Sequence, residues 1–157
     1  MTYNEIIKAS MNKKTRRISK MKIILDEGAK MPTRAHADDA GLDLYSRENR
    51  VIYPHSSATF DTGVHVEIPR GYVGMIKSKS GLNVKHGLTS EGVVDCGYTG
   101  SVRVKLYNHG SRSYTVDVGD KISQLVIMPI ITPELELVKD FGMETARGDN
   151  GFGSTGR

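Results

Sequence analysis

Short runs in which every second residue is apolar dominate this chain of 157 residues. Apolar and polar residues alternate at 64–68 (VHVEI), 102–106 (VRVKL) and 114–118 (YTVDV). Successive side chains of a strand point to opposite faces, so each run predicts a strand with one buried face. Residues 21–25 and 125–131 are more continuously apolar and predict more fully buried strands.

Turn-forming residues separate these runs, at 54–57 (PHSS), 69–71 (PRG), 109–111 (HGS) and 118–120 (VGD). Beyond residue 22 no segment has an apolar helical face of ten or more residues, and only 81–86 allows a short helical turn. Many short strands at near-regular spacing predict an all-β fold, either a sandwich, a jelly roll or a barrel. No internal repeat or linker marks a second domain.

The composition is that of an ordinary globular domain, with 38% hydrophobic and 25% charged residues. No apolar run is long enough to cross a membrane or to act as a signal peptide. The one cysteine, Cys96, excludes an internal disulfide, and the five histidines do not join it at zinc-ligand spacing. We therefore expect a protein of the reducing cytoplasm.

The net charge of +4 comes from the N-terminus. Residues 1–22 hold seven basic residues and one acid, whereas the remaining 135 hold 15 basic and 17 acidic residues, a net of −2. Such an arm either contacts nucleic acid or another protein, or is a solvated extension. We expect a flexible basic arm at 1–20, a β domain at 21–141 and a flexible glycine-rich tail at 142–157.

Two segments offer groups for a metal or a phosphate. Residues 38–44 (DDAGLDL) gather three acids beside a glycine, and carboxylates suit Mg²⁺ or Ca²⁺, although an acidic turn is the alternative. Residues 77–82 (KSKSGL) can bind phosphate through ammonium, hydroxyl and backbone N–H groups, without being a Walker A sequence.

A glycine-framed turn at 92–100 (GVVDCGYTG) carries an acid and an aromatic residue. Asp95 at the rim of the fold can act as a general base, and Tyr98 offers a flat face to a sugar or base, the alternative being a polar turn with a packing tyrosine. Cys96 has no nearby histidine to activate it as a nucleophile. In 119–125 (GDKISQL), Gln124 enters an apolar run, which suggests a core hydrogen bond, a subunit junction or a ligand contact.

The last segment, residues 147–157 (RGDNGFGSTGR), is too rich in glycine to hold a regular element. Arg147 can donate bidentate hydrogen bonds to phosphate oxygens, and Phe152 can stack on a base. Gly153, Ser154 and Thr155 can donate to a terminal phosphate. The alternative is a disordered polar tail.

In this order, the five segments closely resemble the five motifs of the trimeric deoxyuridine triphosphate nucleotidohydrolases (dUTPases), over about residues 22–157. The most specific pieces are residues 40–44, 92–100 and 147–156, and five motifs in register make a chance match implausible.

The resemblance implies a jelly-roll-like distorted β barrel, and a homotrimer whose C-terminal tail is exchanged between subunits. The implied reaction is Mg²⁺-dependent hydrolysis of dUTP to dUMP and pyrophosphate, which limits uracil incorporation into DNA and supplies dUMP for dTMP synthesis. The implied partners are dUTP and the chain itself, with no membrane and no nucleic acid expected.

Individual roles follow from the same resemblance. Asp95 would activate the attacking water, Tyr98 would pack under the deoxyribose, and Asp43 would lie near the water shell of a Mg²⁺ held mainly by the substrate phosphates. The other substrate-binding positions are Lys79, Ser80, Gly81, Gly92, Val93, Val94, Gln124, Arg147, Phe152, Gly153 and Ser154.

Two departures from the family pattern affect this site. Lys79 stands where the family usually has arginine, which keeps the charge and loses the bidentate fork. The hairpin at 86–95 looks shorter than in many relatives and has no asparagine in 87–94, so backbone groups of 92–94 would select uracil.

Two rival functions follow. Deoxycytidine triphosphate deaminases share the fold and need an acid at the pyrimidine ring, for which Glu91 is the only acid in the hairpin, but the tail favours a dUTPase. A regulator that binds a repressor-type protein would apply if the chain is of phage origin.

Overall fold

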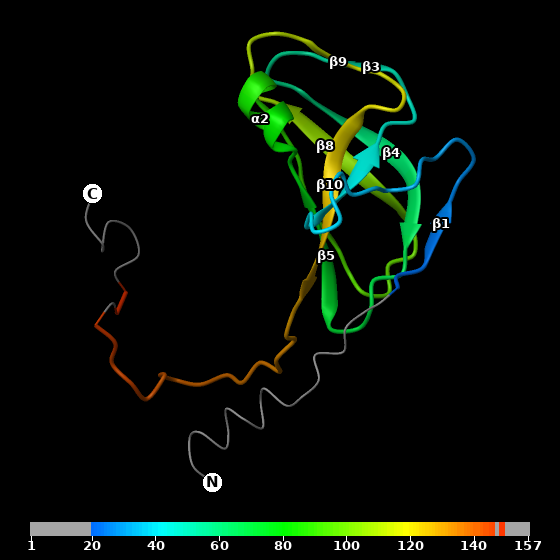
Figure 1. Ribbon diagram of the computed structural model, residues 1–157. Helices are drawn as coiled ribbons and strands as arrows, with labels where there is room; N and C mark the ends of the chain where they lie inside the picture. Colours follow the sequence, from blue (N-terminus) through cyan, green and yellow to red (C-terminus); the bar gives the residue numbers. More distant parts are fainter. Residues whose placement is uncertain (1–19, 147, 150–157) are drawn as a thin grey trace.

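Ten strands and one short helix form the part of the chain that this computed structural model describes, which is residues 20–146, 148 and 149 (Figure 1). The strands are β1 (Ile23–Leu25), β2 (Gly41–Tyr45), β3 (Arg50–Ile52), β4 (Ser57–Val66), β5 (Tyr72–Lys77), β6 (Leu88–Thr89), β7 (Glu91–Val94), β8 (Ser101–Asn108), β9 (Tyr114–Val116) and β10 (Lys121–Pro129). The helix, α2 (Ser80–His86), confirms the short turn expected at 81–86. The arm at 1–19 and the tail residues Arg147, Phe152, Gly153 and Ser154 lie outside the described residues.

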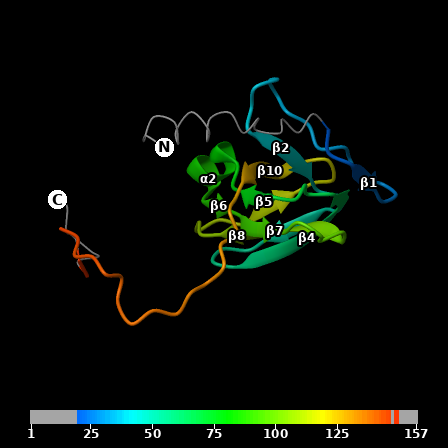
Figure 2. The ribbon, with the colours of Figure 1, turned by 90° about the horizontal axis from the view of Figure 1, so that it is seen from below.

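All strand pairs are antiparallel, which confirms the all-β prediction. One four-stranded sheet has the order β1-β4-β8-β6, a second has the order β2-β10-β5-β7, and β3 pairs with β9. Seen from below, β2, β10 and β5 lie in one layer, and β4 and β8 lie in the other (Figure 2). This layered antiparallel arrangement is consistent with the expected jelly-roll-like barrel.

The period-two runs place their apolar residues inside, as predicted. Val102, Val104 and Leu106 of β8 are at most 1% exposed, while the residues between them are exposed. In the run at 114–118 the expectation is wrong at its end, because the strand stops at Val116 and Val118 is 59% exposed in the following turn.

Two segments expected to be fully buried are not. In β1, Ile24 is 71% exposed, because β1 is an edge strand that pairs only with β4 in the described chain. The segment expected at 125–131 belongs to β10, which begins at Lys121 and buries Leu125 completely. Ile131 is 88% exposed, because the chain has left the sheet after Pro129.

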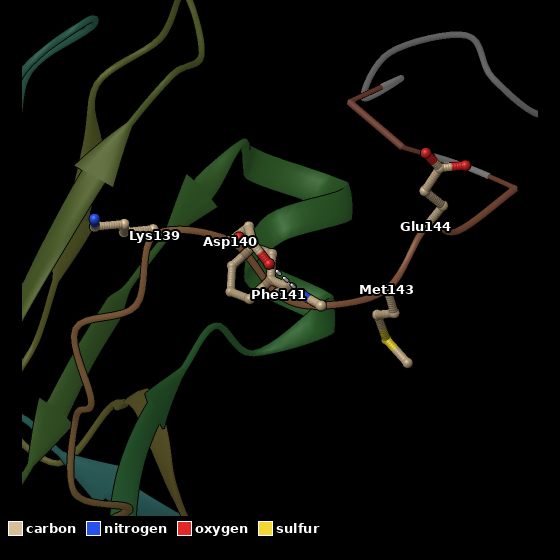
Figure 3. Close-up of a pocket in the computed structure, with 6 residues that line it drawn as sticks. Lys139, Asp140, Phe141, Met143 and Glu144 are labelled. Atoms are coloured by element: carbon tan, nitrogen blue, oxygen red, sulfur yellow. Dashed lines mark hydrogen bonds between the residues drawn. The ribbon is translucent and has the colours of Figure 1, made fainter.

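After β10 the chain runs away from the sheets as an extended segment, residues 130–146, here called the C-terminal arm (Figure 1). Its large apolar side chains are almost bare, with Leu135 96%, Leu137 100% and Phe141 91% exposed. Residues 139–144 line a hollow of about 550 Å³, in which the Gly142 N–H donates to Asp140 Oδ1 at 2.8 Å (Figure 3). Its lining comes from six successive residues of the arm alone, so the sheets contribute nothing to it.

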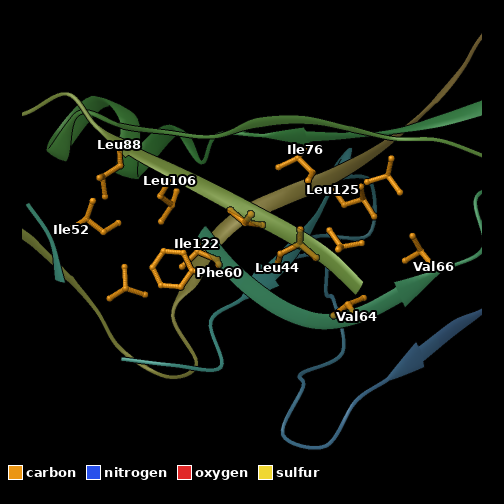
Figure 4. Close-up of a cluster of buried hydrophobic side chains, with 14 of the residues drawn as sticks. Leu44, Ile52, Phe60, Val64, Val66, Ile76, Leu88, Leu106, Ile122 and Leu125 are labelled. Atoms are coloured by element: carbon orange, nitrogen blue, oxygen red, sulfur yellow. The ribbon is translucent and has the colours of Figure 1, made fainter. Parts of the chain in front are cut away.

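The core lies between the two layers (Figure 4). Phe60 of β4 is fully buried and belongs to one cluster with Leu44 of β2 and Leu125 of β10. Buried polar groups are bonded within this core: the Thr62 hydroxyl donates to the Val102 carbonyl at 2.6 Å. Among the described side chains, no buried nitrogen or oxygen lacks a partner.

No helix in the described part of the chain has the length and apolar character needed to cross a bilayer.

Replacing Phe60 by alanine should lower the free energy of unfolding by about 3–5 kcal/mol, because it removes a fully buried ring and leaves a cavity between the layers. Tyr53→Ala is the control, since Tyr53 is 66% exposed and its loss should cost little. Urea unfolding at one fixed protein concentration measures both, and equal effects of the two changes would contradict this account of the core.

Candidate active site

Strand β10 brings three of the predicted segments together. It pairs with β2 on one side and β5 on the other, so Gln124 lies opposite Asp43 and opposite Lys77. The Gln124 side-chain amide donates to the Ser78 carbonyl at 3.0 Å, which ties β10 to the segment before α2. A Cβ on Gly41 would lie 2.0 Å from Gln124 Oε1, so only glycine fits beside this side chain.

A pocket of about 290 Å³ opens at this junction. It is lined by Ala35, Asp39, Ala40, Gly41, Asp43, Lys79 and Gln124. The residues therefore come from the acidic segment, the lysine–serine segment and the segment around Gln124. Ser80 and Gly81 follow as exposed residues in the first turn of α2. Of the residues expected to bind phosphate, Lys79 lines this pocket, and we call it the phosphate pocket after that expectation.

The charged centre of this pocket is Asp43, which is only 5% exposed. Lys79 Nζ contacts its Oδ1, and Lys121 Nζ lies 2.7 Å from its Oδ2. Burial alone would raise the pKa of Asp43, but hydrogen bonds from Lys121 and Lys79 and their charges outweigh it, so the pKa is lowered. The hydrogen bond between Lys121 and Asp43 raises the pKa of Lys121. Asp43 is therefore an ionised carboxylate that fixes the position of two ammonium groups.

Sequence reasoning missed Lys121 as a site residue. An irregularity in pairing between Lys121 and Ser123 sets Lys121 opposite Tyr45, two residues from Asp43 on the same face of β2. If the pairing continued regularly from Gln124, Lys121 would instead lie opposite Ser46, one position further along the chain from Tyr45. No pattern in the sequence predicts this bulge, so the sequence held no signal for Lys121 as a site residue.

The expected outer-sphere role of Asp43 at a metal stays a prediction. Each of its oxygens already has a lysine partner. The described residues contain no group of three or more His, Cys, Asp or Glu side chains that could hold a metal ion.

Asp95 and Tyr98 lie in the turn that follows β7, and both are exposed. The Tyr98 N–H donates to the Asp95 carbonyl at 3.1 Å and closes the turn. The Tyr98 hydroxyl donates to the Ser101 carbonyl at 3.0 Å, which folds the ring over Gly100. We call residues 95–100 the tyrosine turn; it presents a carboxylate and an aromatic ring three residues apart in the chain.

The tyrosine turn and the phosphate pocket lie at opposite ends of the paired strands β5 and β7. Val94 pairs with Gly74 and Glu91 pairs with Lys77. Asp95 is therefore level with Val73, about 13 Å along the sheet from Lys77, and Lys79 lies beyond that end. One chain does not bring Asp95 to its own Lys79 and Ser80.

The hairpin expected at 86–95 does not form within the described chain, because β6 pairs with β8 and β7 pairs with β5. Glu91 of β7 lies at the pocket end, and its Oε1 is 2.5 Å from Lys77 Nζ. Gly92, Val93 and Val94 follow it in β7, which is the edge strand of its sheet. Because β7 pairs only with β5 in the described chain, its outer N–H and C=O groups have no strand partner there. Backbone groups are thus available at the position expected to select the base.

A family model described as dUTPase matches residues 27–156 of this chain. Among curated proteins, the deoxyuridine 5'-triphosphate nucleotidohydrolase of Clostridium tetani is 42% identical over 137 residues, covering 85% of this chain and 94% of that protein. That of Yarrowia lipolytica is 42% identical over 134 residues, covering 84% and 85%.

Solved structures give the same result. A Staphylococcus bacteriophage 80alpha dUTPase with dUpNHpp matches at 34% identity and a TM-score of 0.83, covering 88% of this chain and 99% of that one. A mutant dUTPase of phage phi11 of S. aureus, whose description names a structural Mg(II) ion, matches at 34% identity and a TM-score of 0.74, covering 79% and 99%.

Replacing Asp43 by asparagine should lower the free energy of unfolding by about 1–3 kcal/mol at pH 7, because two lysines lose their buried counter-charge. Since the folded pKa of Asp43 lies below its ordinary value of 3.8, the stabilisation is present above that pH and is lost as the pH falls through the lowered pKa. The gap between wild type and variant should therefore shrink towards pH 2.

Glu67→Gln is the matched control for this prediction. Glu67 pairs with Lys22 at 2.9 Å, but both side chains are more than half exposed, so its loss should be close to neutral. Urea unfolding at several pH values measures both variants, and a pH-independent gap for Asp43→Asn would contradict the assignment.

Proposed function

The chain belongs to the dUTPase family, and from that premise we propose that it hydrolyses dUTP to dUMP and pyrophosphate in a Mg²⁺-dependent reaction. In the cell this activity would limit uracil incorporation into DNA and supply dUMP for dTMP synthesis. The observation that carries the proposal is that the family match runs through residues 27–156 and so includes the phosphate pocket, the tyrosine turn and the tail.

Asp95 is the proposed general base. Its carboxylate is exposed at the rim of the sheet, where a water molecule and a substrate can reach it. It takes a proton from water while the water oxygen bonds to the α-phosphorus. The bond between that phosphorus and the oxygen bridging to the β-phosphate breaks, and pyrophosphate leaves with the electron pair. Positioning and charge stabilisation supply most of the catalysis in such a transfer.

The triphosphate would lie at the phosphate pocket. Lys79 lines this pocket, and its ammonium group is held there by Asp43. This fixed position compensates in part for the rigid bidentate guanidinium group that arginine would offer. Ser80 and Gly81 add a hydroxyl and backbone N–H groups at the start of α2. A Mg²⁺ would be held mainly by the substrate phosphates and would supply charge neutralisation, in keeping with the described residues, which contain no group of three or more His, Cys, Asp or Glu side chains for a metal.

The base would be read by the outer backbone groups of Gly92, Val93 and Val94. An edge strand offers alternating N–H and C=O groups, which can match the donor and acceptor pattern of uracil as a further strand would. Tyr98 lies in the turn after β7 and would pack under the deoxyribose, leaving no room for a 2′-hydroxyl. Arg147, Phe152, Gly153 and Ser154 are proposed to close over the bound nucleotide.

A complete site then requires more than one chain. The two halves of the proposed site lie at opposite ends of the paired strands β5 and β7. The C-terminal arm carries several large apolar side chains that are almost fully exposed, and surfaces of that kind are normally covered by another chain. We therefore propose a homotrimer in which Asp95 and Tyr98 of one subunit meet Lys79 and Ser80 of a second, with a tail from a neighbour.

A regulatory role is a second candidate, favoured by one finding. The similar structures include a Staphylococcus phage dUTPase described as controlling transfer of virulence genes by a G protein-like mechanism. A repressor-type protein would then be a partner of the nucleotide-bound form. Pull-down of purified candidate repressors with and without a non-hydrolysable dUTP analogue tests this, and equal capture in both states would count against it.

Asp95→Asn should reduce turnover of dUTP by about 10²–10⁴-fold, because an amide cannot take the proton from water. Nucleotide affinity should change little, since the base acts on water in the transition state. Steady-state pyrophosphate release and analogue binding separate the two effects. Asp117→Asn, at another exposed turn acid, is the control, and a variant keeping more than about a tenth of the wild-type rate would show that Asp95 is not the base.

Mixing inactive variants tests whether the site is shared. A chain lacking residues 147–157 and the Asp95→Asn chain should each be inactive, yet their mixed trimers should recover activity, because a site can take its tail and its aspartate from different subunits. Co-expression with two affinity tags isolates the mixed assemblies. Isolated heterotrimers with no activity would mean that each chain completes its own site.

A further inference from the structure

The tyrosine turn is held from outside by a histidine to which no role has been assigned. His65 of β4 lies opposite Ser101, the first residue after the turn. Its Nδ1 is 2.8 Å from the carbonyl oxygen of Thr99, and its Nε2 is 3.1 Å from Oδ1 of Asp26. Thr99 adjoins Tyr98, so the imidazole bridges the turn to the segment that follows β1.

Both partners of His65 can only accept hydrogen bonds. A carbonyl oxygen has no proton to give, and neither has an ionised carboxylate. Both ring nitrogens must therefore donate, and only the imidazolium ion carries two N–H groups. A neutral ring keeps one N–H group, and this group stays on the nitrogen that faces the stronger acceptor, the carboxylate of Asp26. Loss of a proton then breaks the bond to Thr99 and leaves a lone pair facing its carbonyl.

The charges around His65 favour the protonated ring. Asp26 follows β1 and Asp61 lies on β4, while Arg47 contacts both carboxylates and Arg103 of β8 reaches Asp61. The bond to the Thr99 carbonyl raises the pKa of His65 most, and burial opposes it as the next largest effect. The hydrogen bond and charge of Asp26 and the charge of Asp61 raise the pKa further, so the net shift is upward.

A second contact secures the other side of the turn and does not involve the histidine. The Ser101 hydroxyl donates to Asp61 Oδ1, which also accepts from the Gly63 N–H at 3.0 Å. Ser101 therefore stays attached to β4 when His65 loses its proton. The part of the turn released is the backbone at Thr99. Tyr98, next to the proposed deoxyribose position, keeps its hydroxyl bond to the Ser101 carbonyl but loses the fixed backbone of its neighbour.

We propose that His65 is a positioning residue for Tyr98, which as the imidazolium fixes the tyrosine turn to Asp26 and as the neutral ring releases it. This role in nucleotide binding rests on the proposed function, whereas the hold on the turn does not. The folded pKa is above the ordinary 6.5, so the hold is complete below that pH and is lost as the pH rises through the folded pKa.

The first experiment needs no substrate. Histidine labelled with ¹³C at Cε1 gives the pKa of His65 by NMR, with the His65→Gln variant used to assign its signal. Hydrogen exchange by mass spectrometry then follows the peptide spanning 95–101 in both proteins at each pH. Since this peptide is identical in the two, its intrinsic exchange cancels. We expect the variant to exchange faster below the pKa of His65, and the wild type to converge on it above.

The second experiment measures kinetics with dUTP and Mg²⁺. Below the pKa of His65, His65→Gln should raise KM about threefold to tenfold and change kcat less than about twofold, because the bond orients a binding group and not the base. Above that pKa the wild-type KM should rise to meet the variant. His109→Gln is the matched control, since this exposed histidine bonds to the Thr89 hydroxyl and should leave the profile unchanged.

Asp26→Asn tests the same bridge with His65 in place. It removes the negative charge beside Nε2 and leaves an amide oxygen as acceptor, so the NMR pKa and the inflection in KM should both move to lower pH. A His65 pKa at or below 6.5, unchanged exchange of 95–101 in His65→Gln, or a variant that keeps the wild-type pH profile of KM would each overturn the proposal. A wild type that does not hydrolyse dUTP would refute the proposed function alone, because the titration and exchange results still decide the role of His65.

Discussion

The pairing of β10 with two neighbours is the constraint on which the rest of the site depends. Because this strand lies between β2 and β5, it sets Asp43, Gln124 and Lys77 in one row across the sheet. Gly41 lets the Gln124 side chain lie against β2, and that side chain holds the carbonyl of Ser78 just before α2. Strand register therefore places Gly41, Asp43 and Gln124 in the wall of the phosphate pocket, while Ala35, Asp39, Ala40 and Lys79 join them from the segments before β2 and α2. Moving Asp43 or Gln124 would break the pairing between β2 and β10.

The same sheet is the reason for proposing that one chain does not complete the site. The paired strands β5 and β7 have the phosphate pocket at one end and the tyrosine turn at the other, and a strand cannot bend to bring its own ends together. Its outer strand, β7, is left unpaired along one edge, which is normally a hazard for aggregation. Here the open edge coincides with the residues expected to read the base. An incomplete sheet and an arm with bare apolar side chains then have a common explanation in assembly.

Charge is arranged in opposite senses at the two halves of the site. At the phosphate pocket a buried carboxylate, Asp43, lies between the ammonium groups of Lys79 and Lys121, and Asp39 adds a second carboxylate to the lining. At the tyrosine turn a single imidazole lies between two acceptors and holds the backbone of the turn in place only while it is protonated. The first arrangement fixes the two ammonium groups at the proposed phosphate position. The second is proposed to determine how firmly Tyr98 is positioned.

The alternation of apolar and polar residues could be interpreted from the sequence, because the face to which a side chain points depends only on its own strand. This is why the buried residues of β8 were predicted and why the glycine, lysine and aspartate motifs were found. The exposure of Ile24 and Ile131 could not be read, because it depends on whether another strand covers them. Nor could Lys121 at Asp43, which requires a bulge in β10, or His65 between Thr99 and Asp26, which lie 34 and 39 residues away in the sequence. Residue types and their spacing along a strand are local properties of the chain, whereas register, edges and the partners of a polar side chain are decided only when distant segments meet.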